Sequence, residues 1–125
     1  MQWDDTPHAG FTSSASEPWM RVNDNYTEVN VKQQLAKKTS VLMYWRKLLA
    51  LRQQHIDVFA HGTFCDIDEK NPSISISIKR HNDKAALVIC NFTSSQQPLS
   101  IPQEFKGREL LLSNVDHSET SMLAP

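Results

Sequence analysis

Three adjacent residues near the start of the chain, Gln2, Trp3 and Asp4, carry the side chains best suited to binding a ligand. The face of an indole ring is flat and apolar, so it stacks on the C–H surfaces of a sugar. A neighbouring amide and carboxylate can hydrogen-bond hydroxyl groups. This combination makes the segment the best candidate in the chain for a carbohydrate contact. The sequence favours the other interpretation for Trp3, a structural anchor that fixes the loop to the rest of the fold.

The 14 acidic residues do not form a predicted catalytic set. Hydrolysis of a glycosidic bond uses two carboxyl groups about 5 to 9.5 Å apart on rigid elements. Asp4 and Asp5 are adjacent, so their side chains diverge in an extended chain. Most of the other acidic residues fall in predicted turns. We therefore predict no catalytic residue within residues 1–125.

The sequence also gives no pattern for a metal or a cofactor. Its histidines and cysteines lack the close spacing of a zinc site. Its 3 glycines are isolated, which argues against a phosphate-binding loop, and no Gly-x-Ser-x-Gly turn is present. We expect no metal and no cofactor. Cys65 and Cys90 lie in strand-like segments and are predicted to be buried, reduced thiols.

The composition is that of an ordinary soluble domain with a modest core. The chain has 125 residues, of which 39% are hydrophobic and 22% charged, and its formal net charge is −1. Such a balance provides no electrostatic basis for binding nucleic acid or an anionic membrane. The N-terminus lacks the pattern of a signal peptide, and no apolar stretch approaches membrane-spanning length. We expect no nucleic-acid partner, no membrane partner and a cytoplasmic location.

Two elements should position the Gln2–Asp4 segment. Residues 1–38 are dense in turn-forming residues but also contain aromatic anchors, so we predict an ordered loop arm rather than a disordered linker. Residues 39–57 are predicted to be a long helix, with Thr39 or Ser40 as its N-cap. The apolar residues of this helix cover about half of its circumference, which suits burial against two neighbours.

Two side chains of this helix carry specific expectations. Trp45 lies on the apolar side and is predicted to be a core residue. Arg52 falls within the apolar arc. Either its stem packs while the guanidinium extends past the helix end, or it forms a buried ion pair.

From residue 58 onward the hydrophobic period changes to two, which predicts strands. The alternating run over 73–79 is the clearest strand, and 85–92 is a second, with a hairpin turn over 81–84. Further strands are expected at 63–68, 99–101, 109–113 and 122–123. Short antiparallel strands with intervening turns are typical of a β-sandwich. The expected fold is therefore mainly β, an antiparallel β-sandwich over 58–125 preceded by one long α-helix and the loop arm.

An ordered set of short motifs resembles the α-glucosidases of the α-amylase superfamily, of the maltase and oligo-1,6-glucosidase type. In chain order, the motifs of the arm are Met1-Gln2-Trp3-Asp4, Ala9-Gly10-Phe11, Pro18-Trp19, Asn23-Asp24-Asn25-Tyr26 and Val29-Asn30-Val31. The helix is similar to the eighth barrel helix of that family, and Ala86-Leu87-Val88 to Asn91-Phe92 resembles a strand of its C-terminal domain. Asp57-Val58-Phe59 resembles fungal maltases in particular.

The resemblance implies a retaining glycosidase with a (β/α)₈ barrel that removes terminal α-linked glucose from short oligosaccharides. The catalytic carboxylates of that family lie on earlier barrel strands, and none maps onto residues 1–125. The chain is therefore expected to be an inactive C-terminal fragment, whose parent binds oligosaccharide through the absent barrel. The final strand of the C-terminal domain is expected to be cut at Pro125.

Two other classes of protein stay open at this point. The heavy chains of amino-acid transporters resemble the same fold and include non-catalytic ectodomains, and a free-standing β-sandwich could bind sugar or protein by itself. For the isolated chain we also expect the apolar arc from Val41 to Leu51 to be exposed, and to cause self-association or marginal stability.

Overall fold

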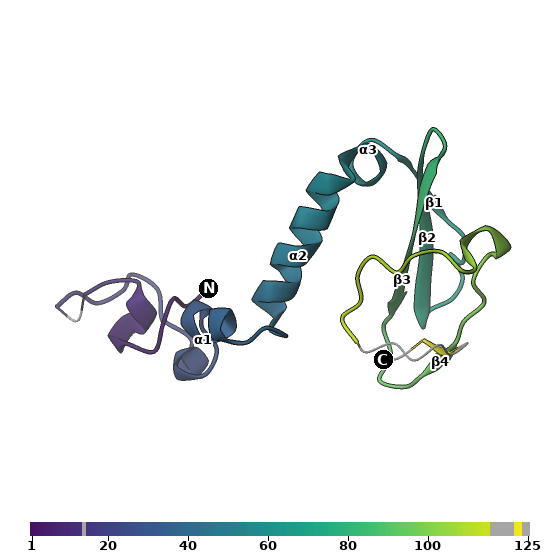
Figure 1. The fold of residues 1–125 in the computed structure, drawn as a ribbon. Helices are drawn as coiled ribbons and strands as arrows, with labels where there is room; N and C mark the ends of the chain where they lie inside the picture. The colour runs from purple at the N-terminus through teal and green to yellow at the C-terminus, as the bar shows by residue number, and fades with distance from the viewer. Residues whose placement is uncertain (14, 116–121, 124–125) are drawn as a thin grey trace. The chain divides into compact units, whose positions relative to one another are not determined.

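The computed structural model of the chain describes residues 1–13, 15–115 and 122–123 (Figure 1). The chain divides into two compact units, residues 1–49 and residues 50–125. The boundary between them lies within the long helix. The finer division into an arm over 1–38, a helix over 39–57 and a β domain over 58–125 stays a prediction.

The N-terminal unit consists of short helical turns joined by loops. Its elements are the 3-10 turns η1 (Pro7–Gly10) and η2 (Asp24–Thr27), the helix α1 (Val31–Ala36) and the first part of the helix α2 (Val41–Gln54) (Figure 1). Asn30 is the N-cap of α1 and is fully buried. Its Oδ1 accepts a hydrogen bond from the Gln33 amide at 2.8 Å, and its Nδ2 donates to the Tyr26 carbonyl at 2.7 Å. The sequence analysis did not predict α1, since six residues give little periodicity.

The prediction of a long helix in this region is confirmed by α2, which is shorter than the predicted range 39–57, and Ser40 is confirmed as its cap. Ser40 Oγ accepts a hydrogen bond from the Met43 amide at 3.3 Å. The prediction that Trp45 is a core residue is wrong, since its side chain is 54% exposed. No residue of α2 is buried, because an apolar arc that covers half a helix needs two neighbouring elements to bury it. Arg52 is exposed, as in the alternative in which its guanidinium extends into solvent.

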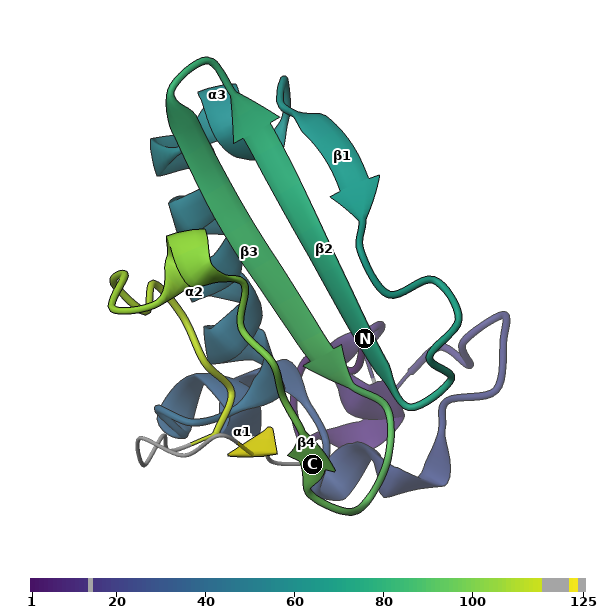
Figure 2. The same ribbon diagram turned by 90° about the vertical axis from the view of Figure 1, so that its right-hand side faces the viewer.

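The C-terminal unit is built on a three-stranded antiparallel sheet. Its strands, in the spatial order β1-β2-β3, are β1 (Thr63–Asp66), β2 (Ile74–His81) and β3 (Lys84–Asn91). The register runs from Thr63 opposite Arg80 in the first pair, and from Ile74 opposite Asn91 in the second. Figure 2 shows β2 and β3 as two long neighbouring strands with the shorter β1 beside β2. The short helix α3 (Ile56–Phe59) packs on β2 and β3.

The core of the C-terminal unit lies on one face of this sheet. The alternation predicted over 73–79 is confirmed, since Ile74, Ile76 and Ile78 are all buried. Leu87 and Ile89 of β3 pack against this cluster. Deleting one of these side chains would remove about 2 to 5 kcal/mol of stability. The sheet is therefore the best-packed part of the described residues.

The predicted hairpin turn is also confirmed. β2 ends at His81 and β3 begins at Lys84, which leaves a two-residue connection. Asn82 adopts a left-handed conformation, with φ of 52°. Asn tolerates left-handed backbone better than most residues, which is why Asn82-Asp83 between two strand-like runs predicts a tight turn.

Two of the weaker strand predictions are wrong. No strand forms over 99–101 or over 109–113, because an apolar run forms a strand only where a partner completes its hydrogen-bond ladder. Instead, β4 (Gln97–Pro98) pairs with β5 (Met122–Leu123), which confirms the strand expected at 122–123. A β-sandwich needs two sheets packed face to face, and it stays a prediction here. The expected loss of a final strand at Pro125 lies outside the described residues.

Both cysteines are free, but the prediction that they are buried is wrong, since both are exposed. Cys65 lies on the edge strand β1, where no further strand of the sheet covers it. Cys90 is opposite Ser75, on the face of the sheet away from the isoleucine core. In the part of the chain that the structure describes, no helix is long and apolar enough to cross a membrane.

Candidate functional site

The backbone of the Gln2–Asp4 segment is held on both sides by main-chain hydrogen bonds. The carbonyls of Gln2 and Trp3 accept hydrogen bonds from the amides of Val31 at 2.9 Å and Lys32 at 3.0 Å, at the start of α1. On the other side, the Trp3 amide donates to the Ala9 carbonyl at 2.9 Å. The predicted binding segment is therefore an extended piece of chain fixed between α1 and η1.

Three consecutive residues of η1 have left-handed backbone conformations. His8, Ala9 and Gly10 have φ of 59°, 53° and 71°, and Ala9 is fully buried. Left-handed backbone is unfavourable for a non-glycine residue and persists only where surrounding contacts enforce it. At Gly10 an added Cβ would lie 3.1 Å from Trp3 Cβ and from both carboxylate oxygens of Asp4. This position requires glycine for its backbone angle and for its close approach to the binding segment.

The carboxylate of Asp4 closes a tight turn with Thr6. Its Oδ1 accepts hydrogen bonds from the Thr6 amide at 2.9 Å and from the Thr6 hydroxyl at 2.5 Å. These two bonds hold the pKa of Asp4 below its ordinary value of 3.8, because they stabilise the charged form. Asp4 is therefore an ionised turn-former at neutral pH.

The adjacent Asp5 has a different partner. It forms an ion pair with Lys32, with 2.8 Å between Lys32 Nζ and Asp5 Oδ1. This hydrogen bond lowers the pKa of Asp5 and raises that of Lys32. The two neighbouring carboxylates thus engage separate groups.

Trp3 lies toward solvent on this fixed backbone, whereas Gln2 is half-buried. The Trp3 side chain is 55% exposed, while Gln2 Nε2 donates to Asn25 Oδ1 at 2.9 Å. An aromatic face held on a rigid backbone beside polar groups loses little entropy when it binds a flat apolar surface. This geometry suits stacking on a sugar ring as well as packing against another part of a protein.

Sequence reasoning missed several residues that build this site. Thr6 had a usable signal, because an Asp two residues before a Thr is a common turn motif. Asn25 had none, since it lies 23 residues from Gln2 and meets it only through the fold. Ala9 and Gly10 were noted only for their sequence pattern, which does not reveal a left-handed run that includes an alanine.

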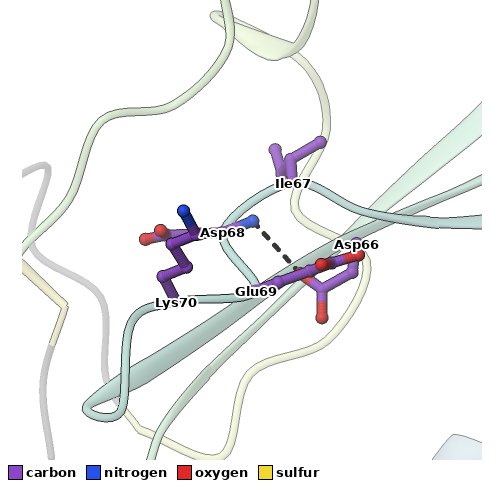
Figure 3. Close-up of a pocket in the computed structure, with 5 residues that line it drawn as sticks. All are labelled: Asp66, Ile67, Asp68, Glu69 and Lys70. Carbon is purple, nitrogen blue, oxygen red and sulfur yellow. Dashed lines mark hydrogen bonds between the residues drawn. The ribbon is translucent and has the colours of Figure 1, made fainter.

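A shallow pocket lies in the C-terminal unit, in the turn between β1 and β2. It encloses about 320 Å³ and is lined by Asp66, Ile67, Asp68, Glu69 and Lys70 (Figure 3). The Asp68 amide donates to Asp66 Oδ1 at 3.1 Å, the dashed line in Figure 3. This bond organises the turn itself. Among the described residues no group of three or more His, Cys, Asp or Glu side chains could hold a metal ion.

The N-terminal part of the chain matches a known protein family. The family model for the α-amylase catalytic domain matches residues 1–62. The oligo-1,6-glucosidase of Bacillus cereus is 41% identical over 118 residues, which are 93% of this chain and 21% of that enzyme. The α-glucosidase of Candida albicans is 38% identical over 128 residues, covering 100% of this chain and 22% of the relative. The chain spans about a fifth of the length of the curated relatives it matches.

Solved structures give the same result. The trehalulose synthase MutB from Pseudomonas mesoacidophila superposes with a TM-score of 0.87 at 28% identity, over 99% of this chain and 23% of that one. The trehalose-6-phosphate hydrolase of Bacillus licheniformis superposes with a TM-score of 0.85 at 29% identity, again over 99% of this chain and 23% of that one. The similarity thus extends beyond the residues matched by the catalytic-domain family.

Proposed function

Because this chain belongs to the α-amylase superfamily, we propose that it is the C-terminal part of an α-glucosidase that hydrolyses terminal α-linked glucose in short oligosaccharides. The observation that carries the proposal is the similarity over nearly the whole chain to proteins named oligo-1,6-glucosidase and α-glucosidase. In this proposal, residues from the matched range 1–62 belong to the catalytic domain.

The proposal divides the chemistry between this chain and the rest of the enzyme. A retaining glycosidase uses a nucleophile and an acid/base about 5 to 5.5 Å apart. Both carboxyl groups are assigned to barrel strands outside residues 1–125, so this chain alone does not hydrolyse substrate. The proposed role of its β domain, with the β-sandwich expected from the sequence, is to support the barrel rather than to carry out the reaction.

Within this chain the proposed substrate contact is the Gln2–Asp4 segment. Trp3 would stack on a sugar ring through its exposed face, with Gln2 beside it as a hydrogen-bonding group. Support comes from the partial exposure of Trp3 and from the main-chain bonds that fix it at 2.9 and 3.0 Å. The alternative role, an anchor to the barrel rim, requires the same backbone but a buried ring in the whole enzyme.

A further part of the proposal concerns the isolated chain. Val41, Trp45 and Leu49 are spaced four residues apart and are 66%, 54% and 55% exposed, so they form one apolar stripe along α2. Exposed stripes of this kind promote association. We expect the purified chain to self-associate through this stripe, and Trp45→Glu to shift it toward monomer in sedimentation velocity. A wild-type chain that stays monomeric at high concentration would contradict this part.

The functional proposal is tested with a chimaera. This chain replaces the matched 118-residue segment of the Bacillus cereus oligo-1,6-glucosidase, and hydrolysis of isomaltose and maltose is measured. The expected result is a folded chimaera that releases glucose from at least one of them. The isolated chain, assayed in parallel, should release no nitrophenol from nitrophenyl α-glucoside. A folded but inactive chimaera, or activity of the isolated chain, would contradict the proposal.

A further inference from the structure

A continuous path of hydrogen bonds joins the carboxylate of Asp4 to the backbone of Trp3. Asp4 Oδ1 accepts from both the amide and the hydroxyl of Thr6. The Thr6 carbonyl accepts from the Ala9 amide at 2.9 Å, and the Ala9 carbonyl accepts from the Trp3 amide at 2.9 Å. The path begins at Asp4 and returns to the neighbouring Trp3, so it closes a small ring of chain over residues 3–9.

Packing reinforces this ring. Ala9 is fully buried within it, and its left-handed backbone aims its carbonyl at the Trp3 amide. Gly10 lies directly against Trp3 Cβ and the Asp4 carboxylate, where a side chain would approach to 3.1 Å. The strained conformation of Ala9 is held by its backbone hydrogen bonds to Thr6 and Trp3, and Thr6 is in turn bonded by Asp4.

We infer that Asp4 is a positioning residue for Trp3, acting through Thr6 and Ala9, and is not itself a ligand of the sugar. The inference rests on the proposed function, because the purpose of positioning Trp3 follows from its proposed contact with sugar. It assigns different tasks to two residues that the sequence grouped together. Trp3 presents the binding face, and Asp4 fixes the backbone that carries it.

The two roles of Asp4 predict different responses to substitution. Asp4→Asn keeps an oxygen acceptor for both Thr6 donors, whereas Asp4→Ala removes it. Thr6→Val removes the hydroxyl donor from the partner side and leaves Asp4 unchanged. Asp5→Asn is the matched control, because it removes a neighbouring carboxylate whose ion pair with Lys32 is exposed and contributes little.

The test uses the full 125-residue chain and two readouts by NMR. The first is the hydrogen-exchange rate of the Trp3 amide, and the second is the shift of the Trp3 indole resonance during titration with maltose or isomaltose. We expect Asp4→Ala to accelerate exchange of the Trp3 amide about tenfold or more, and Thr6→Val to act in the same direction. Asp4→Asn and Asp5→Asn should stay within about threefold of wild type. The amide of Ile76 in β2 reports in each variant that the sheet remains folded.

The outcomes separate the inference from the proposed function. Equal Trp3 exchange in wild type and Asp4→Ala overturns the inference. Loss of the sugar-induced shift in Asp4→Asn, with the Trp3 amide still protected, also overturns it, because Asp4 would then contact the sugar directly. An indole resonance that does not respond to sugar in wild type, together with fast exchange in Asp4→Ala, contradicts the sugar contact and leaves the positioning role supported.

Discussion

The N-terminal unit and the C-terminal unit of this chain are held together by different kinds of contact. In residues 50–125, antiparallel strands bury the isoleucines of β2 against β3. Among the described residues of 1–49, those that are buried are Ala9, Asn30 and Ser40, and loop hydrogen bonds fix the backbone. Both units leave large apolar side chains exposed, among them Trp3 and Trp19 in the first and Phe64 and Phe92 in the second, but the second also buries its isoleucine cluster.

This difference has a consequence for function. A unit that gains its order from backbone hydrogen bonds can leave aromatic side chains free to contact a substrate or another part of a protein. A unit that gains its order from burial needs part of its apolar side chains for its core. The proposed function accordingly gives the sugar contact to the N-terminal unit and the supporting role to the C-terminal unit.

The largest expected effect is the removal of a buried isoleucine. Ile76 is 6% exposed, and Ile76→Ala should lower the free energy of unfolding of the C-terminal unit by about 4 kcal/mol. Trp19→Ala removes a larger side chain that is 98% exposed, and should change the stability of the N-terminal unit by less than about 0.5 kcal/mol. Urea denaturation with hydrogen exchange as a readout for each unit measures both. A larger effect for Trp19 would reverse the comparison.

The second largest expected effect is the addition of a methyl group at Gly62, which lies against the backbone of two segments. A Cβ at Gly62 would lie 2.3 Å from the Val58 carbonyl oxygen and 2.9 Å from that of Arg80. Gly62→Ala should destabilise the C-terminal unit by about 3 kcal/mol, because backbone atoms cannot move aside. Gly107→Ala is the control, since its φ is +70° but nothing lies within 4 Å, and it should cost about 1 kcal/mol. Equal losses in the two variants would show that the close approach does not matter.

The next effect lies in the N-terminal unit, where the fully buried Asn30 caps α1. Asn30→Ala removes an acceptor for Gln33 and a donor to Tyr26, and should destabilise this unit by about 2 kcal/mol. Asn23→Ala is the matched control, because Asn23 precedes η2 and makes no side-chain cap hydrogen bond. Thermal unfolding followed by far-UV circular dichroism compares the two. Similar melting temperatures for both variants would contradict the cap assignment.

The smallest expected effect is a pH dependence of the turn at Asp4. Hydrogen bonds from Thr6 lower the pKa of Asp4, with Lys32 acting in the same direction and Asp5 against it. The ionised carboxylate of Asp4 thus stabilises the turn fully when the pH is above 3.8, the ordinary pKa of an Asp side chain. This stabilisation is lost as the pH falls through the lowered pKa of Asp4. A carbon-detected NMR titration should place the Asp4 midpoint below 3.8. Asp4→Asn should remove this part of the acid sensitivity, and a midpoint at or above 3.8 would contradict the account.

The sequence predicted the elements whose pattern is local and long. The alternation of serine and isoleucine over 73–79 and the apolar run over 85–92 became β2 and β3, and the apolar helix became α2. The pairing of β4 with β5 joins segments more than 20 residues apart, so no local pattern reveals it. The exposure of Trp45 could not be predicted from the sequence. Burial of a helix residue depends on which other elements pack against the helix, and the helix sequence does not specify them.

The candidate site was predicted by residue type but not by geometry. The sequence singled out Gln2, Trp3 and Asp4, and the structure places them on one fixed stretch of backbone. It did not reveal that Asp4 binds Thr6 or that Gln2 meets Asn25. These contacts depend on a left-handed run and on a long-range approach, neither of which has a strong sequence signature.

The central claim is that the N-terminal unit contacts sugar, while the C-terminal unit supports the barrel. The most direct test is kcat/KM of the chimaera with the Bacillus cereus enzyme. Two exposed aromatics are compared, Trp3 of the binding segment and Phe64 of β1, which is 63% exposed. We predict that Trp3→Ala lowers kcat/KM for isomaltose or maltose about tenfold or more at unchanged Tm, and that Phe64→Ala leaves it within about twofold. Unchanged kcat/KM in Trp3→Ala, or a loss in Phe64→Ala at unchanged Tm, would contradict the claim.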